Sequence, residues 1–342
     1  MEIKGVAGLV PSVSADRLSV LVQPPPLVVR WDPSAVGLDA GEGERLAVML
    51  GAAPTVTVLV ADPSGPPPAL VDAFDVCLTE HPEPPAPWGP ASSLGGLTRA
   101  VEAQPLASLA LVALLRSRAA AGLHGDVWGG LAAESATYAA LLRGGAFATW
   151  LASRGPATPA LASPAVALAR AGNELEITLD RPDVHNAFNT AMRDELVEAF
   201  QLAAADATIS EVRLRGNGPS FCSGGDLSEF GSVGDPAVAH AVRLTRHPGY
   251  WAHLCRDRLK VQVHGACVGA GIEVPAFAGH ISATADSFFA LPEVGMGLIP
   301  GAGGTVSITR RIGRQRCAWL ALTGARLDAA SALRWGLVDE VT

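Results

Sequence analysis

The sequence has no long basic run, no cysteine cluster and no apolar stretch long enough to span a bilayer. Its formal net charge is −8, so neither nucleic acid nor an anionic membrane surface is expected as a partner. The longest apolar run, Leu106 to Leu115, is too short for a transmembrane helix. The N-terminus also lacks the charged and apolar regions of a signal peptide. We therefore expect a soluble, cytoplasmic protein.

The five cysteines are scattered along the chain, with no Cys-x-x-Cys and no zinc-type spacing. This pattern is typical of reduced, buried thiols in a reducing compartment, and no bound metal is expected. A hydrophobic content of 49% over 342 residues predicts a folded protein with one large core or two smaller ones.

Composition shifts divide the chain into four parts. Residues 1–95 read as a degenerate α/β segment that ends in proline-rich sequence, and residues 96–155 read as a helical, cap-like region. Residues 156–164 look like a linker, and strand and helix patterns alternate over 165–342. The alternation predicts an α/β fold in which helices cover a sheet.

Local patterns give more detailed expectations. PLVVRW and TVTVLVAD read as buried strands, with the helical DAGEGERLAVML between them. ELEITLD and EVRLRG read as strands, KVQVHGACVG as a strand that leads into a helix, and HISATADSFFAL as a strand pair. Asn189 or Thr190 is expected to cap the helix that follows.

Two glycine-rich junctions stand out, one over residues 217–230 (NGPSFCSGGDLSEF) and one over 264–273 (HGACVGAGIE). If they meet in space, they offer two converging backbone N–H groups to one developing oxyanion. Tight turns also need glycines, so the pattern alone leaves both explanations open. Neither junction matches a dinucleotide or phosphate-loop motif.

Two glutamates lie in unusually apolar sequence. Glu273 is the one charge in VHGACVGAGIEVPAFA, and Glu293 follows in FFALPEVGMGLIPGAGG. A single buried carboxylate is more often a salt bridge or a helix cap. A pair in a dry cleft is suited to general acid–base chemistry, because desolvation and mutual repulsion raise at least one pKa toward neutrality.

Five ordered segments together resemble the enoyl-CoA hydratase/isomerase (crotonase) superfamily. They are RPDVHNAFNTAM, FCSGGDL, VHGACVGAGIE, LPEVGMGLIPGAGGT and ALTGARLDAASALRWGLVDEV, and the resemblance runs from about Val166 to the C-terminus. It implies a crotonase-like spiral of ββα turns that binds an acyl-CoA thioester, with an N-terminal α/β and helical region added. No cofactor is expected, because coenzyme A is part of the substrate.

The resemblance also implies roles for particular residues. Glu273 and Glu293 match the catalytic pair of hydratases, and the N–H groups of Gly225 and Ala270 match the oxyanion hole. The carbonyl of Ser223 matches the position that holds the adenine amino group. Three further residues are expected near the CoA portion of the substrate, and they are Asp226, Arg181 and His185; His185 could equally be a solvated turn residue.

The chain departs from the family in its order. The core is followed by no helical tail, whereas about 160 residues precede it. We expect residues 97–155 to supply the helical cap from the N-terminal side; an unrelated helical domain is an equal alternative. Trp128, Tyr138, Phe147 and Trp150 would then line the acyl pocket or pack in an ordinary core. A homo-oligomer, a trimer or a multiple of it, is the family's default.

The leading hypothesis is an enoyl-CoA hydratase that adds water across the 2,3 double bond. Other acyl-CoA chemistry in the superfamily (isomerase, thioesterase or dioxygenase) would keep the oxyanion hole without needing both glutamates. A non-catalytic acyl-CoA-binding subunit would bind the thioester without turning it over. The sequence is silent on acyl-chain length, on pathway and on the role of residues 1–95.

Overall fold

The computed structural model describes residues 2–4, 26–31, 40–122, 125–154 and 164–342. Within these ranges the chain forms two compact units: residues 1–122 with 312–323, and residues 123–311 with 324–342. The expected linker lies outside the described residues except for Pro164. The helical region expected over 96–155 is divided between the two units, so the units do not follow the expected boundaries.

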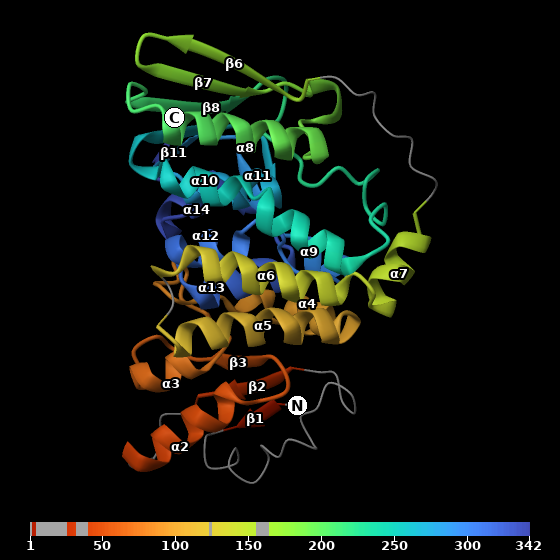
Figure 1. Ribbon diagram of the computed structural model, residues 1–342. Coiled ribbons are helices and arrows are strands. Elements are labelled where there is room, and N and C mark those ends of the chain that lie inside the picture. Colours follow the sequence, from red (N-terminus) through yellow and green to blue (C-terminus); the bar gives the residue numbers. More distant parts are fainter. Residues whose placement is uncertain (1, 5–25, 32–39, 123–124, 155–163) are drawn as a thin grey trace. The chain divides into compact units, whose positions relative to one another are not determined.

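The N-terminal unit is built on a parallel sheet in the order β1-β2-β3-β4-β5 (Figure 1). Strands β3 and β4 are buried at every position, which is typical of parallel strands covered on both faces. The strands are β1 (Glu2–Lys4), β2 (Leu27–Arg30), β3 (Thr57–Val60), β4 (Val76–Thr79) and β5 (Gly89–Pro90). The two strands and the helix expected between residues 26 and 62 are thereby confirmed.

Helices complete this unit. They are α2 (Ala40–Gly51), α3 (Pro68–Ala73), α4 (Leu94–Ala103), α5 (Pro105–Ala120) and α13 (Arg314–Thr323). Helix α13 contacts α4, α5 and β4, so a segment near the C-terminus is part of this core. The guanidinium of Arg316 donates to the carbonyl of Pro84, and the indole of Trp319 donates to Ser93.

The second unit holds two sheets. The larger runs in the order β14-β11-β9-β8-β7-β6, and only its β6–β7 pair is antiparallel. The smaller has the order β10-β12-β13. The strands are β6 (Val166–Ala171), β7 (Glu174–Leu179), β8 (Glu211–Gly216), β9 (Leu259–Val263), β10 (Ala266–Val268), β11 (His280–Ala283), β12 (Phe288–Ala290), β13 (Leu327–Asp328) and β14 (Glu340–Val341).

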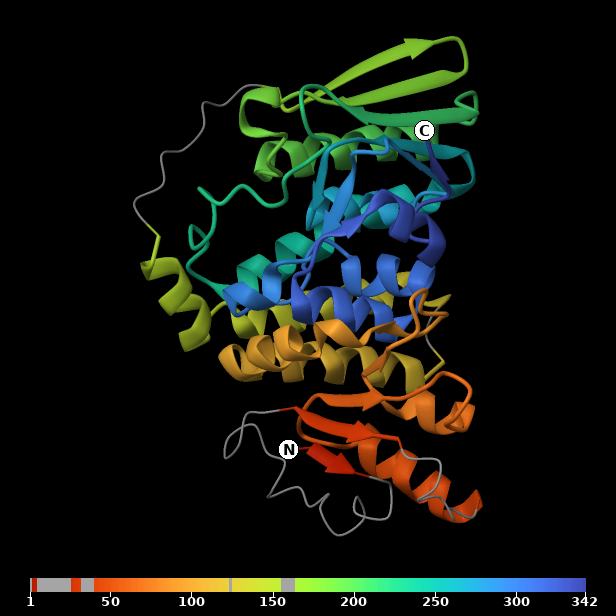
Figure 2. The ribbon, with the colours of Figure 1, turned by 180° about the vertical axis from the view of Figure 1, so that it is seen from behind.

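The helices of the second unit are α6 (Val127–Leu141), α7 (Gly145–Ala152), α8 (Thr190–Ala205), α9 (Pro236–Thr245), α10 (Pro248–Leu254), α11 (Ala270–Glu273), α12 (Gly304–Ile312) and α14 (Ala329–Trp335). Asn189 caps α8 as expected, because its side chain accepts from the N–H of Met192. Helix α8 packs along β6 and β7, which Figure 2 shows from behind in green. The mixture of sheets and helices confirms the α/β class.

Two expectations needed correction. The KVQVHGACVG segment forms two strands, β9 and β10, in different sheets before α11 begins. The HISATADSFFAL segment forms β11 and β12, which also belong to different sheets and do not pair. Each time, the glycine or turn between the strands redirects the chain from the large sheet to the small one.

Among the described helices, none is by itself long and apolar enough to cross a membrane. The consecutive helices Ala91–Ala103 and Pro105–Ala119 reach that length only together, and the chain bends by 108° between them.

Candidate active site

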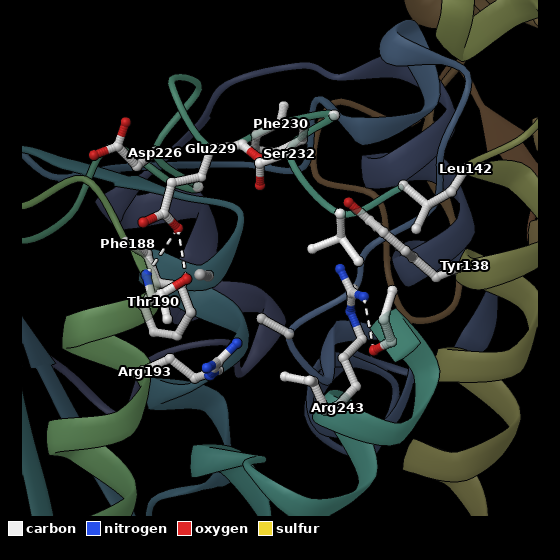
Figure 3. Close-up of a pocket in the computed structure, with 18 of the residues that line it drawn as sticks. Tyr138, Leu142, Phe188, Thr190, Arg193, Asp226, Glu229, Phe230, Ser232 and Arg243 are labelled. Carbon is white, nitrogen blue, oxygen red and sulfur yellow. Dashed lines mark hydrogen bonds between the residues drawn. The ribbon is translucent and has the colours of Figure 1, made fainter. Parts of the chain in front are cut away.

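A cavity of about 620 Å³ lies within the second unit. It contains the carboxylates Glu273 and Glu293. Figure 3 shows Tyr138 and Arg243 on one side of it and Thr190 and Glu229 on the facing side. Apolar side chains from three regions line the rest: Leu142, Phe147, Leu151, Phe188, Phe230 and Val242.

The two glycine-rich junctions meet beside this cavity. Cys222 and Cys267 form an isolated parallel bridge, in which the N–H of Val268 donates to Cys222 and the N–H of Cys222 to Ala266. A Cβ on Gly271 would lie 2.4 Å from the carbonyl oxygen of Cys222, so only glycine allows this approach. The convergence expected from the sequence is therefore present in the structure.

Gly225 and Ala270 both line the cavity. The N–H of Asp226 donates to Phe188, whose own N–H donates to Gly224, which leaves the intervening N–H of Gly225 outside this bridge. Ala270 is the first residue of α11, where a backbone N–H has no partner within its own helix. Two backbone donors beside one cavity are what an oxyanion needs.

Glu273 and Glu293 come together at Gly269, which precedes α11 with a φ of +50°. A Cβ placed on Gly269 would lie 2.5 Å from Oε1 of Glu293 and 3.7 Å from Oε1 of Glu273. Glycine at this position thus keeps the space in which the two carboxyl groups approach one another. Glu273 ends α11, and Glu293 begins the 3-10 turn η8 (Glu293–Met296).

The two carboxyl groups have different hydrogen-bond environments. Oε2 of Glu273 accepts from the N–H groups of Ala302 and Gly304, each at 2.8 Å. Glu293 is partly exposed as a residue, yet its Oε2 is buried and has no hydrogen-bond partner among the described residues. Glu273 is therefore held in place, whereas Glu293 has an oxygen free to bind a ligand atom.

Both carboxyl groups hold protons more tightly than an ordinary glutamate. Burial raises the pKa of Glu273 well above its usual value, and the negative charges of Glu293 and Glu134 add to the effect. Burial also raises the pKa of Glu293, to about 8, with a further contribution from the charge of Glu134. Near neutral pH, the pair therefore retains at least one proton.

A third buried glutamate belongs to the same site. Glu134, on α6, is 1% exposed. Its Oε1 accepts from the N–H of Gly303 at 2.7 Å, and its Oε2 accepts from the N–H and hydroxyl of Thr305 at 2.9 and 2.6 Å. Burial raises its pKa to about 7, against the opposing effect of these hydrogen bonds.

Helices α6 and α7 form one wall of the cavity. A Cβ on Gly301 would lie 2.5 Å from the Tyr138 ring, and a Cβ on Gly297 would lie 2.8 Å from the backbone nitrogen of Phe147. Tyr138 and Phe147 line the cavity, as expected for acyl-pocket residues; Trp128 and Trp150 are not among the lining residues. The segment 127–152 thus packs directly against the loop that follows Glu293.

The remaining predicted CoA-binding residues do not line the cavity, except for Asp226. Arg181 is buried and pairs with Asp226 at 3.0 Å, so its guanidinium joins two segments of the unit. His185 has a φ of 54° and a hydrogen bond from its Nδ1 to Ser220, which fits an exposed turn residue. Ser223 is exposed, and its N–H donates to the carbonyl of His185. Contacts of these residues with CoA remain predictions.

Sequence reasoning missed Glu134 and Arg243. Glu134 is one acid in a helix of small and apolar residues, LAAESATYAALL, and that isolation was the available signal. Arg243 lies with its guanidinium carbon 4.0 Å from the centroid of the Tyr138 ring. Within the described ranges, no group of three or more His, Cys, Asp or Glu side chains is arranged to hold a metal ion.

Comparison with known proteins identifies the family of this chain. The family model for enoyl-CoA hydratase/isomerase matches residues 171–342, half of the chain. The chain therefore belongs to the enoyl-CoA hydratase/isomerase family, and the resemblance and the crotonase-type fold expected from the sequence are confirmed. Helices α6 and α7, which wall the cavity, lie outside the matched residues.

Individual relatives cover the same part of the chain. The 2,3-dehydroadipyl-CoA hydratase of Escherichia coli (strain K12) is 35% identical over 49% of this chain and 65% of its own length. The "Probable enoyl-CoA hydratase" of Rhizobium meliloti (strain 1021) is 34% identical over 48% of this chain and 63% of its own length. This chain thus spans less than two thirds of these relatives. The solved enoyl-CoA hydratase of Thermoplasma volcanium GSS1 is 33% identical, with 53% of this chain and 72% of that chain covered and a TM-score of 0.48.

Proposed function

We propose that this chain is an enoyl-CoA hydratase, which adds water across the 2,3 double bond of a 2-enoyl-CoA thioester. The observation that carries the proposal is the pair of buried carboxyl groups at Gly269, one held by two N–H groups and the other with an unpartnered oxygen. Relatives named as hydratases support the same chemistry. An isomerase needs only one carboxylate to move its proton, so the paired acids favour hydration.

In the proposed mechanism, the thioester oxygen accepts from the N–H groups of Gly225 and Ala270. One such donor typically lowers the barrier by about 3 kcal/mol, because it stabilises the enolate-like charge that develops on the oxygen. A water molecule between the carboxyl groups adds its oxygen to C3 and gives one proton to ionised Glu273. Protonated Glu293 gives its proton to C2. The elements of one water are thereby added, and proton exchange restores the pair.

The raised pKa of Glu293 and the hydrogen bonds to Glu273 favour this division of labour. With a pKa of about 8, Glu293 is protonated near neutral pH and can act as an acid. Glu273 accepts two N–H hydrogen bonds on Oε2, which favour its charged form once Glu293 carries the shared proton. Burial, with a smaller contribution from the neighbouring negative charges, keeps at least one proton on the pair near neutral pH.

The test is hydration of crotonyl-CoA and of a longer 2-enoyl-CoA, followed by loss of the conjugated thioester absorbance. Glu273→Gln and Glu293→Gln should each lower kcat on the order of 1,000-fold, as expected when a positioned acid or base is lost. Both variants should still bind the thioester. Glu102→Gln, an exposed change on α4, is the matched control and should have wild-type activity. Hydration that survives both active-site substitutions would rule out the mechanism.

Several wider expectations accompany this function as proposals. They are a cytoplasmic location, a homo-oligomeric state, and no cofactor beyond the coenzyme A of the substrate. Light scattering of the purified chain measures the oligomeric state directly. Helices α6 and α7 would act as the cap over the acyl chain, since they already form a wall of the cavity.

A further inference from the structure

Two glutamates share the backbone donors of residues 302–305, a segment that leads into the first turn of α12. Along residues 302–305, the N–H groups of Ala302 and Gly304 donate to Glu273, whereas those of Gly303 and Thr305 donate to Glu134. The four consecutive N–H groups thus alternate between the two carboxyl groups. Moving either acid would displace the donors of the other, because neighbouring peptide units share one backbone.

Both ends of this arrangement are buried. Glu134 is 1% exposed and Glu273 is 2% exposed, and neither has a salt bridge to Lys or Arg among the described residues. Glycine is required at 304, where a Cβ would lie 2.8 Å from Cγ of Glu273. A desolvated carboxyl group that keeps all its donors is expensive to displace, which makes the arrangement rigid.

We propose that Glu134 is a positioning residue of the active site: it fixes residues 302–305 at the start of α12, and this segment in turn fixes the carboxyl group of Glu273. This inference rests on the proposed function and extends it to a segment that lies outside the family match. Glu134 acts through Glu273 and does not itself touch the substrate. Helix α6 is thereby part of the catalytic apparatus as well as a wall of the cavity.

The charge of Glu134 has a second effect. It raises the pKa of both Glu273 and Glu293, because a nearby negative charge favours the protonated form. Arg243 on α9 lowers the pKa of Glu134 and so favours the charged form that produces this effect.

Two other titratable groups near Glu134, Tyr138 and His247, have pKa values far from neutral pH. Burial raises the pKa of Tyr138 to about 12 and lowers that of His247, whose ring lies near Gly303, to about 4. Ser135 on the same helix bonds His240 on α9. A pH shift near neutrality produced by changing Glu134 is therefore not expected to arise in Tyr138 or His247.

The test compares Glu134→Gln with Ser135→Ala. Glu134→Gln removes the charge and one acceptor, so kcat should fall on the order of 10- to 100-fold with KM little changed, as expected for a small misplacement of a catalytic group. Both limbs of the pH–kcat profile should move to lower pH. Ser135→Ala removes the 2.8 Å hydrogen bond between α6 and α9 and should leave the profile in place.

A milder variant is available in case Glu134→Gln does not fold. Thr305→Val removes the hydroxyl donor of Glu134 but keeps the backbone N–H. Loss of this hydroxyl raises the pKa of Glu134, so Glu134 carries less negative charge near neutral pH. It then raises the pKa values of Glu273 and Glu293 by less than in the wild type. The profile should therefore move in the same direction, but by less. Thr305→Ser should restore the wild-type profile.

A readout without substrate separates this inference from the proposed function. Carbon-13 NMR of labelled glutamate carboxyl groups in the free protein should show lower pKa values for Glu273 and Glu293 in Glu134→Gln. This result would stand even if wild-type protein failed to hydrate crotonyl-CoA, which would remove only the hydratase assignment. Unchanged carboxyl titrations and an unchanged pH profile, with a loss of thermal stability alone, would overturn the positioning role.

Discussion

Both units of the molecule bury carboxyl groups, but the two units offset the cost of desolvating these groups in different ways. In the N-terminal unit, Asp75 is 1% exposed and accepts from Arg116 at 2.5 and 2.7 Å and from the N–H and hydroxyl of Thr57. Arg314 lies 3.7 Å away. Arg116 also donates to the carbonyls of Ala53 and Thr55, so one guanidinium joins the segments that lead into β3 and β4. This acid is fully paired, which suits a purely structural role.

In the second unit, three glutamates of the candidate site, Glu134, Glu273 and Glu293, have no salt bridge to Lys or Arg among the described residues. Glu134 and Glu273 have backbone donors, Glu293 has an unpartnered Oε2, and the pKa of all three is raised. Carboxyl groups with such shifted pKa values are costly to keep and are found where protons are transferred. Burial of an acid alone therefore does not indicate a catalytic role. A buried acid paired with Arg is structural, whereas buried acids without such a pair and with raised pKa values are suited to proton transfer.

The largest expected effect on stability comes from unpairing the structural acid. Asp75→Asn would leave the guanidinium of Arg116 without its counter-charge in a buried position. Loss of one partner from a buried pair typically costs about 3–5 kcal/mol, which urea unfolding of the full chain would measure. A variant as stable as the wild type would show that the Asp75–Arg116 ion pair does not stabilise the N-terminal unit, which would remove the contrast with the active-site acids.

Glu293→Gln is expected to stabilise the folded protein at alkaline pH, whereas Asp75→Asn destabilises it. A carboxyl group with a raised pKa binds more protons folded than unfolded, so its contribution to stability is greatest below its usual pKa of 4.5 and is lost as the pH rises to about 8. The glutamine variant has no such titration. At pH 8 it should be more stable than the wild type by a few kcal/mol, at most about 4, and this difference should disappear toward pH 4.5.

Thermal unfolding of both proteins across that pH range measures the difference. Glu211→Gln, a change at a surface glutamate whose pKa is lowered by hydrogen bonds from Arg213 and Lys260, is the control and should not gain stability as the pH rises. Equal pH dependence in the wild type and in Glu293→Gln would show that Glu293 is an ordinary exposed acid.

The local parts of this comparison could be predicted from the sequence. Apolar runs gave the strands β2 and β3, Asn189 gave a helix cap, and linked glycine motifs brought Glu273 beside Glu293. Those features depend on neighbours in the chain or on motifs with fixed spacing. A lone glutamate in otherwise apolar sequence indicates a special site, because burying its carboxyl group is unfavourable unless the fold supplies hydrogen-bond donors.

The remaining features depend on contacts between distant segments. Glu134 lies 171 positions from Thr305, and Asp75 lies 41 positions from Arg116. The isolation of Glu134 in apolar sequence indicates that the residue is unusual, but nothing in the local pattern of α6 identifies the distant segment that supplies its hydrogen-bond donors. The division of the helical block between two units is of the same kind, since α5 and α6 differ in what they pack against and not in their helical pattern.

The pH dependence of kcat/KM for crotonyl-CoA hydration tests the central claim most directly. The account predicts a bell-shaped profile whose alkaline limb falls near pH 8, where Glu293 loses the proton that it gives to C2. A rate that stays constant or rises through pH 8 would contradict it, because no shared proton on the glutamate pair would then be needed for turnover.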